Sequence, residues 1–207
     1  MLYLANPCGG DVVTAMNDGT LGFIDTPAQG NRRPPGITWC ADNGCFGKGY
    51  PGDEKWIAWL ERNAHEAPSC LFATAPDVVG EAAATLERSR PWLPKIRALG
   101  YPAALVAQDG LEVLEVPWDE FDVLFLGGST EWKLGPWARE LTRQAKDRGK
   151  WVHMGRVNSE RRYRYANAIG CDSADGTFLV FGPDKNLPRL KTWLRTADQH
   201  AFDITLN

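Results

Sequence analysis

The sequence predicts an α/β protein, and within that class a compact (β/α)8 TIM barrel that forms one domain over residues 1–207. Short apolar runs and helical segments alternate six to eight times along the chain. The apolar runs are continuous, which is typical of parallel strands that are buried on both faces. Eight such units would close a barrel, and 207 residues are enough, although few, for that fold. An open, doubly wound parallel sheet is the alternative architecture.

The expected strands are short apolar runs that mostly end in a small polar cluster. "LYLANP" at the start of the chain and "DVLFLGGS" near its middle show the pattern. A short apolar run that is bounded by turn residues is typical of a buried strand. The runs cover residues 2–7, 37–44, 70–77, 103–110, 122–129, 151–158 and 168–176, with 177–184 as a further candidate.

Helical patterns fill the intervals between these runs. The first places four apolar residues on about one face, and Asp53 is its expected N-cap. A pair of helices follows and is expected to break at Pro91 and Pro94. A later helix is expected to begin near Pro136 and to end at Gly149. The expected helices cover residues 52–64, 78–89, 91–100, 135–149, 159–170 and 187–199.

The charge of the chain is weakly acidic and unevenly distributed. The formal net charge is −3, whereas a protein that coats nucleic acid usually carries excess positive charge. Residues 151–195 carry eight Arg or Lys and four Asp or Glu, so this part of the chain has a net charge of +4. These numbers argue against a dedicated nucleic-acid coat protein but allow a local basic face.

Five cysteines are scattered along the chain, at positions 8, 40, 45, 70 and 171. They form no CxxC pair, and no Cys/His spacing fits a zinc site. Reduced thiols in an intracellular protein are the simplest explanation. The sequence opens without a signal peptide and has no apolar run near the ~18 residues that span a bilayer. We therefore expect a cytoplasmic protein, in the host cell if the chain is viral, with no membrane partner.

The polar residues at the carboxyl ends of the expected strands are the candidate site. Both architectures bring these ends to one edge of the sheet, where active sites form. Each histidine has a structural explanation. His65 falls in a helical pattern, His153 in a buried strand and His200 in the tail of the chain. A pocket without histidine is therefore expected, and histidine-based activation of a nucleophile is not. The candidates are Asp42, Asp77, Gln108, Gly127, Gly128, Ser129, Arg156, Asp172 and Asp175.

Six segments resemble, in collinear order, the tRNA-guanine transglycosylases and their relatives that put 7-deazaguanine bases into DNA. "TWCADNGCF" is similar to the family's TDSGGFQ strand end, "LVAQDG" to its VQGG, and "LFLGGSTEWKLG" to its GGLAVGE loop. "TAPDVVG" and "LERSRPWLPKIRALG" resemble the segments that carry a base-reading aspartate and an RS-x-x-W helix. "VHMGRVNSERRYRYANAIGCDSADGT" resembles the segment that carries the nucleophile. The resemblance covers most of the chain and favours the barrel over the open sheet.

The resemblance implies two catalytic carboxylates. Asp175 matches the second Asp of the family's GVDMFD motif and would be the nucleophile, with Asp172 as the fallback and otherwise a structural acid. Asp42 would act as general acid or base on a ring nitrogen of the base. A carboxylate suits attack on a sugar C1′ because the transition state resembles an oxocarbenium ion. The alternatives are that Asp172 and Asp175 cap the next element and that Asp42 forms an Asx-turn with Asn43 and Gly44.

The resemblance also implies a pocket that reads the base. Asp77 would accept hydrogen bonds from the N1–H and exocyclic amine of a guanine-like ring, and Gln108 would pair with its O6 side. Glycines would let backbone groups approach the base closely. The alternatives are a loop residue at Gln108, an ordinary turn at the glycine pair, and a core position for Phe46 instead of stacking on the base. The implied substrate-binding residues are Asp77, Gln108, Gly127, Gly128, Ser129, Phe46 and Asp172.

Departures from the family pattern bear on the partner. The family's Cys/Cys/Cys/His zinc cluster is missing, and "GTFLVFGPDKN" replaces an Arg-rich segment that helps to hold tRNA. DNA is therefore favoured over tRNA, as in the compact phage-type branch. The target nucleotide must be flipped or single-stranded. Four arginines would hold its flanking phosphates, although a solvated helix face is the alternative. They are Arg156, Arg161, Arg162 and Arg164.

Together these features predict a guanine transglycosylase. It would replace guanine in a polynucleotide with a 7-deazaguanine base through a covalent aspartyl–sugar intermediate, without a metal or redox cofactor. Two rival hypotheses stay open. One is a nucleoside or N-glycoside hydrolase with a similar pocket, and the other is a non-catalytic viral protein that binds a deazapurine or nucleotide.

Overall fold

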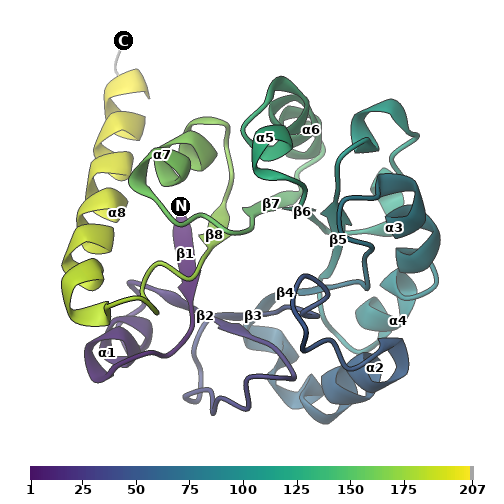
Figure 1. Ribbon diagram of the computed structural model, residues 1–207, viewed down its shortest axis with the longest axis horizontal. Helices are drawn as coiled ribbons and strands as arrows, with labels where there is room; N and C mark the ends of the chain where they lie inside the picture. The colour runs from purple at the N-terminus through teal and green to yellow at the C-terminus, as the bar shows by residue number, and fades with distance from the viewer. Residues whose placement is uncertain (206–207) are drawn as a thin grey trace.

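The strands of the described chain form a closed barrel. The computed structural model describes the backbone of residues 1–205 and the side chains of residues 1–196. Every neighbouring pair of strands is parallel, and β1 pairs with β8 to close the ring (Figure 1). The predicted (β/α)8 TIM barrel is confirmed, and the alternative of an open sheet is wrong. The strands are β1 (Leu2–Ala5), β2 (Gly22–Asp25), β3 (Trp39–Ala41), β4 (Cys70–Thr74), β5 (Ala103–Ala107), β6 (Val123–Leu126), β7 (Trp151–Met154) and β8 (Ser173–Asp175).

Helices surround the barrel and follow most of the strands. As predicted, Pro136 occupies the first turn of its helix, and the break between the helix pair falls at Pro91. Pro94 lies in the first turn of the second helix of that pair, where proline is tolerated. The helices are α1 (Gly10–Asn17), α2 (Asp53–Arg62), α3 (Ala82–Ser89), α4 (Leu93–Ala98), α5 (Thr130–Lys133), α6 (Pro136–Asp147), α7 (Glu160–Ala168) and α8 (Pro183–Thr205), with short 3-10 turns η1 (Ala64–Ser69), η2 (Leu111–Val113) and η3 (Trp118–Glu120).

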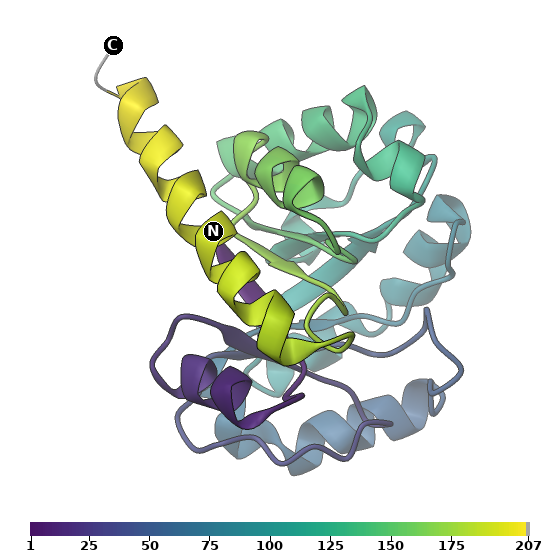
Figure 2. The same cartoon turned by 60° about the vertical axis from the view of Figure 1, so that its left-hand side comes forward.

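Two connections between strands lack an α-helix, which helps the fold to fit in so short a chain. Residues 26–38, all described by the structure, join β2 to β3 without a helix. Between β5 and β6 the described chain has only the turns η2 and η3 in place of an α-helix. The last helix, α8, packs beside α1 and α7 and so covers the place where the barrel closes (Figure 2). Within residues 1–205, no helix is both long enough and apolar enough to cross a membrane.

The barrel has two buried layers because each strand is covered on both faces. On β5, Ala104 and Val106 point into the barrel, whereas Ala103, Leu105 and Ala107 pack under the surrounding helices. This arrangement accounts for the continuous apolar runs in the sequence. The inner layer also holds side chains from five other strands, namely Leu4, Ile24, Cys40, Phe72, Val123 and Phe125.

Two regions, one near each end of the chain, differ from the expectation. The apolar-run pattern misses β2, because its four residues include a glycine and an aspartate, and it misses α1 before it. Conversely, residues 177–182 form a bend and a turn instead of a strand. The pairing of β8 with β1 leaves this segment no sheet edge to join. The Asn186 side chain instead holds it by donating to the carbonyl oxygens of Phe178 and Phe181.

The expected N-cap of α2 is also wrong. Gly52 is the N-cap, and Asp53 is the first residue of the helix. The Asp53 carboxylate is used elsewhere, because it accepts hydrogen bonds from the hydroxyl of Tyr50 and the guanidinium of Arg88. These contacts tie the start of α2 to α3, close to the loop that follows β3.

A buried arginine anchors the long connection between β2 and β3. The Arg33 side chain is 5% exposed and forms ion pairs with Asp25 and, at 3.0 Å, with Glu66. It also donates to Asn63 at 2.8 Å, and its guanidinium lies 3.7 Å from the ring centroid of Trp39. The loop is thereby attached to η1 and to β3, whose last residue directly precedes a candidate catalytic acid.

Candidate active site

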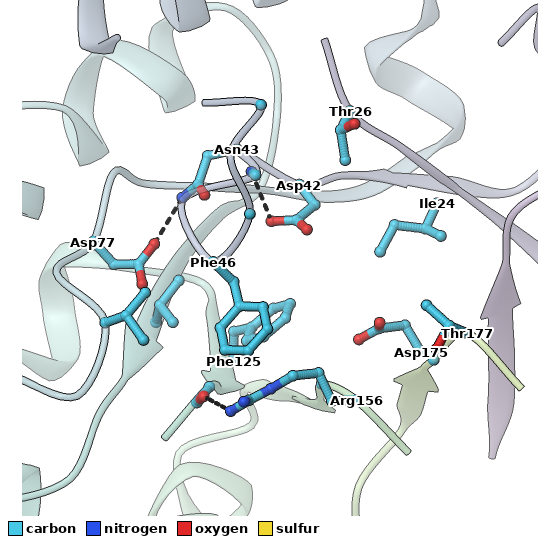
Figure 3. Close-up of a pocket in the computed structure, with 18 of the residues that line it drawn as sticks. Ile24, Thr26, Asp42, Asn43, Phe46, Asp77, Phe125, Arg156, Asp175 and Thr177 are labelled. Atoms are coloured by element: carbon cyan, nitrogen blue, oxygen red, sulfur yellow. Dashed lines mark hydrogen bonds between the residues drawn. The ribbon is translucent and has the colours of Figure 1, made fainter. Parts of the chain in front are cut away.

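A cavity of about 480 Å³ opens at the carboxyl ends of the strands. Seven of the residues singled out from the sequence line it: Asp42, Phe46, Asp77, Gln108, Gly127, Arg156 and Asp175. Most of them are drawn in Figure 3, which shows their side chains converging from loops that are far apart in the sequence. The carboxyl ends of the strands thus bring these seven residues to one cavity. Other lining residues include Asn6, Ile24, Thr26, Gln29, Asn43, Phe125, Gly155, Asn158 and Thr177.

Asp42 directly follows β3 and reaches into this cavity. Its backbone N–H donates to the carbonyl of Asp25 at 2.9 Å, which extends the sheet by one residue. Its carboxylate accepts a hydrogen bond from the N–H of Gly44 at 3.3 Å, so the proposed Asx-turn is present. Burial, and secondly the negative charge of Asp175, raise the pKa of Asp42 to about 7. A carboxyl group with this pKa can both give and take a proton near neutral pH.

Asp175 is the last residue of β8 and faces the same cavity as Asp42 (Figure 3). The backbone places it firmly, because its carbonyl accepts a hydrogen bond from the N–H of Val157 at 2.6 Å. The Asp175 side chain is 16% exposed, which leaves it accessible from the cavity. The structure therefore brings together the two acids to which the sequence analysis assigns catalysis.

A histidine lies behind Asp175, although the sequence analysis expects none at the site. His153 is a fully buried residue of β7, as predicted, and its Nε2 lies 2.9 Å from Oδ1 of Asp175. Its Nδ1 lies 2.8 Å from Oγ of Ser173, which also accepts a hydrogen bond from the indole of Trp151 at 2.8 Å. The register of β7 against β8, which pairs His153 with Ser173, creates this contact. No spacing within either strand signals it.

Asp77 and Gln108 form a polar wall of the cavity on the side away from Asp175 (Figure 3). Asp77 is 5% exposed and accepts hydrogen bonds from Nδ2 of Asn43 at 3.0 Å and Nε2 of Gln108 at 2.8 Å. Oε1 of Gln108 accepts from the N–H of Gly80 at 3.0 Å, so the orientation of its amide is fixed. Burial raises the pKa of Asp77 above its usual range. The buried Asn43, absent from the predicted set, belongs to this cluster because it also donates to the carbonyl of Ala75.

The glycine loop is held by Arg156. The Arg156 guanidinium donates to the carbonyl oxygens of both Gly127 and Gly128. It also lies 4.2 Å from the ring centroid of Phe46, in a cation–π contact that crosses the cavity. Phe46 is 63% exposed, so its alternative position in the core is wrong. Arg156 has a φ of 61°, a conformation that a non-glycine residue adopts at some cost.

A buried cation, Lys133, lies close enough to Arg156 to be affected by its charge. Lys133 is 4% exposed, and its ammonium group donates to the carbonyl of Gly155, which lines the cavity. Burial, and secondly the positive charge of Arg156, lower the pKa of Lys133 to about 7. The sequence analysis misses Lys133, because a lysine on a short helix gives no sign of burial.

Three of the predicted substrate-binding residues lie outside the cavity lining. Asp172 precedes β8 and lies at the opposite end of that strand from Asp175, where it pairs with Lys146 at 2.7 Å and accepts from the N–H of Val152. Three residues of extended chain span roughly 10 Å, so the two acids cannot share one site. Ser129 is the N-cap of α5 and accepts from the N–H of Trp132. Gly128 contributes its carbonyl to Arg156 but does not line the cavity.

The arginines of α7 divide into two kinds. Arg164 is exposed and pairs with Glu160 one turn away at 2.7 Å, which fits the alternative of a solvated helix face. Arg161 is exposed, and Arg162 donates to the carbonyl of Arg156 at 3.3 Å. Only Arg161 and Arg162 therefore remain beside Arg156 as candidates for phosphate contacts. Among the described residues, no cluster of three His, Cys, Asp or Glu side chains could hold a metal ion.

Comparison with known proteins bears on the fold alone. No protein-family model and no curated protein matches the chain. A chain of the BexX/CysO complex from Amycolatopsis orientalis matches with 18% identity and a TM-score of 0.58, over 94% of this chain and 86% of that one. Tryptophan synthase from M. tuberculosis matches in two forms, with 13% and 12% identity and TM-scores of 0.54 and 0.52, each over 93% of this chain and 89% of that one. At these identities the likeness establishes one thing, that the chain has the fold of the parallel (β/α)8 TIM barrels.

Proposed function

We propose that this protein is a guanine transglycosylase that exchanges guanine in a polynucleotide, preferably DNA, for a 7-deazaguanine base. One observation carries the proposal: Asp42 and Asp175, from strands far apart in the sequence, face the same cavity. Base exchange at a sugar needs one carboxylate to attack C1′ and a second group to move a proton on the base. Both acids line the cavity, and the raised pKa of Asp42 lets it carry a proton near neutral pH, as the proton-moving role requires.

In the first half of the reaction, Asp175 attacks C1′ of the target nucleotide. An oxygen lone pair of its carboxylate forms the new C1′–O bond while the C1′–N9 bond breaks and its electron pair goes to the departing guanine. Asp42, protonated at the start, gives its proton to a ring nitrogen of that guanine. The negative charge of Asp175 is one of the causes of the raised pKa of Asp42. Ester formation removes this charge, so Asp42 becomes a stronger acid as the leaving base needs the proton.

In the second half, the incoming 7-deazaguanine takes the place of guanine. Asp42, now a carboxylate, removes the proton from its ring nitrogen, and that nitrogen attacks C1′. The C1′–O bond to Asp175 breaks, and its electron pair returns to the carboxylate. Both acids are then in their starting protonation states, so the exchange consumes no other reactant.

The opposite wall of the cavity suits a guanine-like ring. Asp77 has acceptor capacity beyond its hydrogen bonds to Asn43 and Gln108, and these lone pairs can take the N1–H and exocyclic amine of the base. The exposed ring of Phe46 offers a face on which a base can stack once Arg156 moves aside. Because a base within a duplex cannot reach such a cavity, the substrate nucleotide is flipped out or single-stranded.

The test is an exchange assay with the Asp175→Ala variant. The protein is incubated with a guanine-containing DNA oligonucleotide and radiolabelled guanine, and then with unlabelled 7-deazaguanines as competitors. We expect the wild type to incorporate label and to form an adduct with DNA that survives denaturing electrophoresis. Asp175→Ala should lose both, with a fall in rate on the order of a thousand-fold or more.

The matched control is Asp172→Ala, which changes an acid at the far end of the same strand. This variant should keep exchange activity, because Asp172 lies outside the cavity. Normal turnover by Asp175→Ala would disprove the assignment of the nucleophile. Release of guanine without incorporation would identify a hydrolase instead, and binding of a deazapurine without release or exchange would identify a non-catalytic binding protein.

A further inference from the structure

A chain of polar side chains crosses the apolar interior of the barrel and ends at Asp175. The indole N–H of Trp151 donates to Oγ of Ser173 at 2.8 Å, this oxygen lies 2.8 Å from Nδ1 of His153, and Nε2 of His153 lies 2.9 Å from Oδ1 of Asp175. His153 and Ser173 are both fully buried. Polar groups at such a place are costly unless each finds a partner, and this chain gives every member one.

The chemistry of the partners fixes the direction of the hydrogen bonds. An indole nitrogen can only donate, and an ionised carboxylate can only accept. Nε2 of His153 must therefore carry the hydrogen that Asp175 accepts. In the neutral ring, Nδ1 is then an acceptor and takes the hydroxyl hydrogen of Ser173, whose oxygen is meanwhile occupied by Trp151. The outer partners thus select a single tautomer of His153.

Packing holds the imidazole ring in position as well. The ring centroid of His153 lies 4.5 Å from that of Phe125 and 5.0 Å from that of Phe72. Both phenylalanines belong to the inner layer of the barrel. A ring that is fixed by two aromatic neighbours and by a hydrogen bond at each nitrogen has little freedom to turn. Its Nε2–H therefore points at one oxygen of the carboxylate, Oδ1.

We infer that His153 is the positioning residue of the nucleophile: it binds Oδ1 of Asp175 and so leaves Oδ2 as the oxygen that attacks the sugar. This inference rests on the proposed base exchange. After attack, Oδ2 is bonded to C1′ and Oδ1 is the carbonyl oxygen of the ester, still bound by His153. When the C1′–Oδ2 bond breaks, its electron pair returns to the carboxylate, and the hydrogen bond from His153 stabilises the returning charge. His153 keeps its hydrogen throughout.

This role makes an asymmetric prediction for the two half-reactions. A donor that stabilises the free carboxylate does not make it a stronger nucleophile, but it makes it a better leaving group. Loss of the donor should therefore slow breakdown of the covalent intermediate more than its formation. A residue that served only the packing of the barrel would lower both steps together.

The kinetic test compares His153→Leu with His153→Gln. Leucine removes the donor, whereas the amide N–H of glutamine can replace Nε2–H. We expect His153→Leu to lower kcat by about 10- to 100-fold while the steady-state amount of DNA adduct rises, and His153→Gln to recover most of the loss. Ser173→Ala, which keeps the histidine, should show a smaller loss of the same kind and serves if the leucine variant does not fold. Equal losses in the Gln and Leu variants, or adduct that falls in parallel with turnover, would overturn the inference.

A spectroscopic test does not depend on activity. In ¹⁵N-labelled wild-type protein, nitrogen-15 NMR should show His153 as the Nε2–H tautomer with a slowly exchanging proton, and Asp175→Ala should remove that protection. The Nδ1–H tautomer in the wild type would overturn the inference. If no exchange activity is found but the Nε2–H tautomer is present, the proposed function fails while the contact with Asp175 stands. If exchange activity is found but the tautomer is Nδ1–H, the proposed function stands and only the role of His153 fails.

Discussion

At the scale of single residues, Asp42 is an acid whose ionisation is coupled to the stability of the fold. Burial and the charge of Asp175 raise the pKa of Asp42 to about 7, compared with an ordinary value near 4. The folded state therefore binds a proton at Asp42 more tightly than the unfolded state does. As pH rises from about 4 to about 7, the folded state loses stability, because it must ionise a carboxyl group that the unfolded chain ionises more easily. The ionisation of Asp42 thus lowers the free energy of unfolding at neutral pH.

Replacing Asp42 by asparagine should remove this loss of stability. Asp42→Asn stays neutral at every pH, so its free energy of unfolding relative to wild type should increase by about 2–3 kcal/mol between pH 5 and pH 8. Denaturant unfolding at the two pH values measures the change. Asp119→Asn, which alters an exposed acid, is the control and should show no such trend. An advantage of Asp42→Asn that is the same at both pH values would mean that the carboxyl group is ionised normally in the folded state.

The sequence predicts a site residue only where the strand pattern itself marks its position. Asp42, Asp77, Gln108 and Asp175 each stand at or just beyond the end of an apolar run, so the strand pattern and the topology together place them. His153 is different, because its role depends on the register between two strands. Asp172 shows the converse error: two residues separate two acids that look equivalent in the sequence, and only the bounds of β8 decide which one reaches the cavity.

At the scale of elements, the junction between β8 and the β7–α7 loop is packed without spare room. A Cβ atom at Gly176 would lie 2.3 Å from Oδ1 of Asn158, 2.7 Å from the hydroxyl of Tyr3 and 2.7 Å from the carbonyl of Val157. These neighbours are themselves committed, because Tyr3 donates to Val157 at 3.0 Å and Asn158 accepts from the N–H of Thr177. The residue that follows Asp175 must therefore be glycine.

Alanine at this position should destabilise the protein. Gly176→Ala should lower the free energy of unfolding by about 1–3 kcal/mol, because overpacking forces the surrounding backbone to shift. Gly10→Ala is the matched control: its Cβ would meet nothing within 4 Å, and it begins α1. That variant should be unchanged or up to about 1 kcal/mol more stable. Denaturant unfolding compares the two, and equal stabilities would mean that the junction yields at little cost.

The sequence patterns locate long elements well and short ones poorly. The twelve residues of α6 begin with proline and have a full amphipathic period, so both the helix and its start are predictable. The four residues of β2 include Gly22 and Asp25, and they are recognisable as a strand only between β1 and β3. The apolar residues of 177–182 read as a strand, but the closed barrel has no edge to receive them.

At the scale of the whole molecule, an acidic protein carries a basic segment that begins at a strand beside its cavity. The net charge is −3, yet residues 151–195 carry a net charge of +4. Arg156 lines the cavity together with Asp175, Arg162 donates to the carbonyl of Arg156, and Arg161 is its neighbour on α7. If these three contact phosphates of a single strand, the logarithm of the binding constant should fall with the logarithm of salt concentration with a slope of about −2.

The salt dependence of binding tests this arrangement. Fluorescence anisotropy of a labelled single-stranded oligonucleotide between ~50 and ~200 mM salt gives the slope, and the double variant Arg161→Ala/Arg162→Ala should reduce it to about −0.7. Arg164→Ala is the control, because Arg164 is paired with Glu160 and should not change the slope. A similar reduction in the control would assign the phosphate contacts to the outer face of α7.

The pairing of β1 with β8 has a consequence for the order in which the barrel assembles during synthesis. Leu4 of β1 is in register with Asp175 of β8, so the proposed nucleophile is held in place by a strand that is synthesised some 170 residues earlier. Contacts of such long sequence separation form late in folding. The cavity that holds both acids therefore cannot assemble on a nascent chain until β8 has been synthesised.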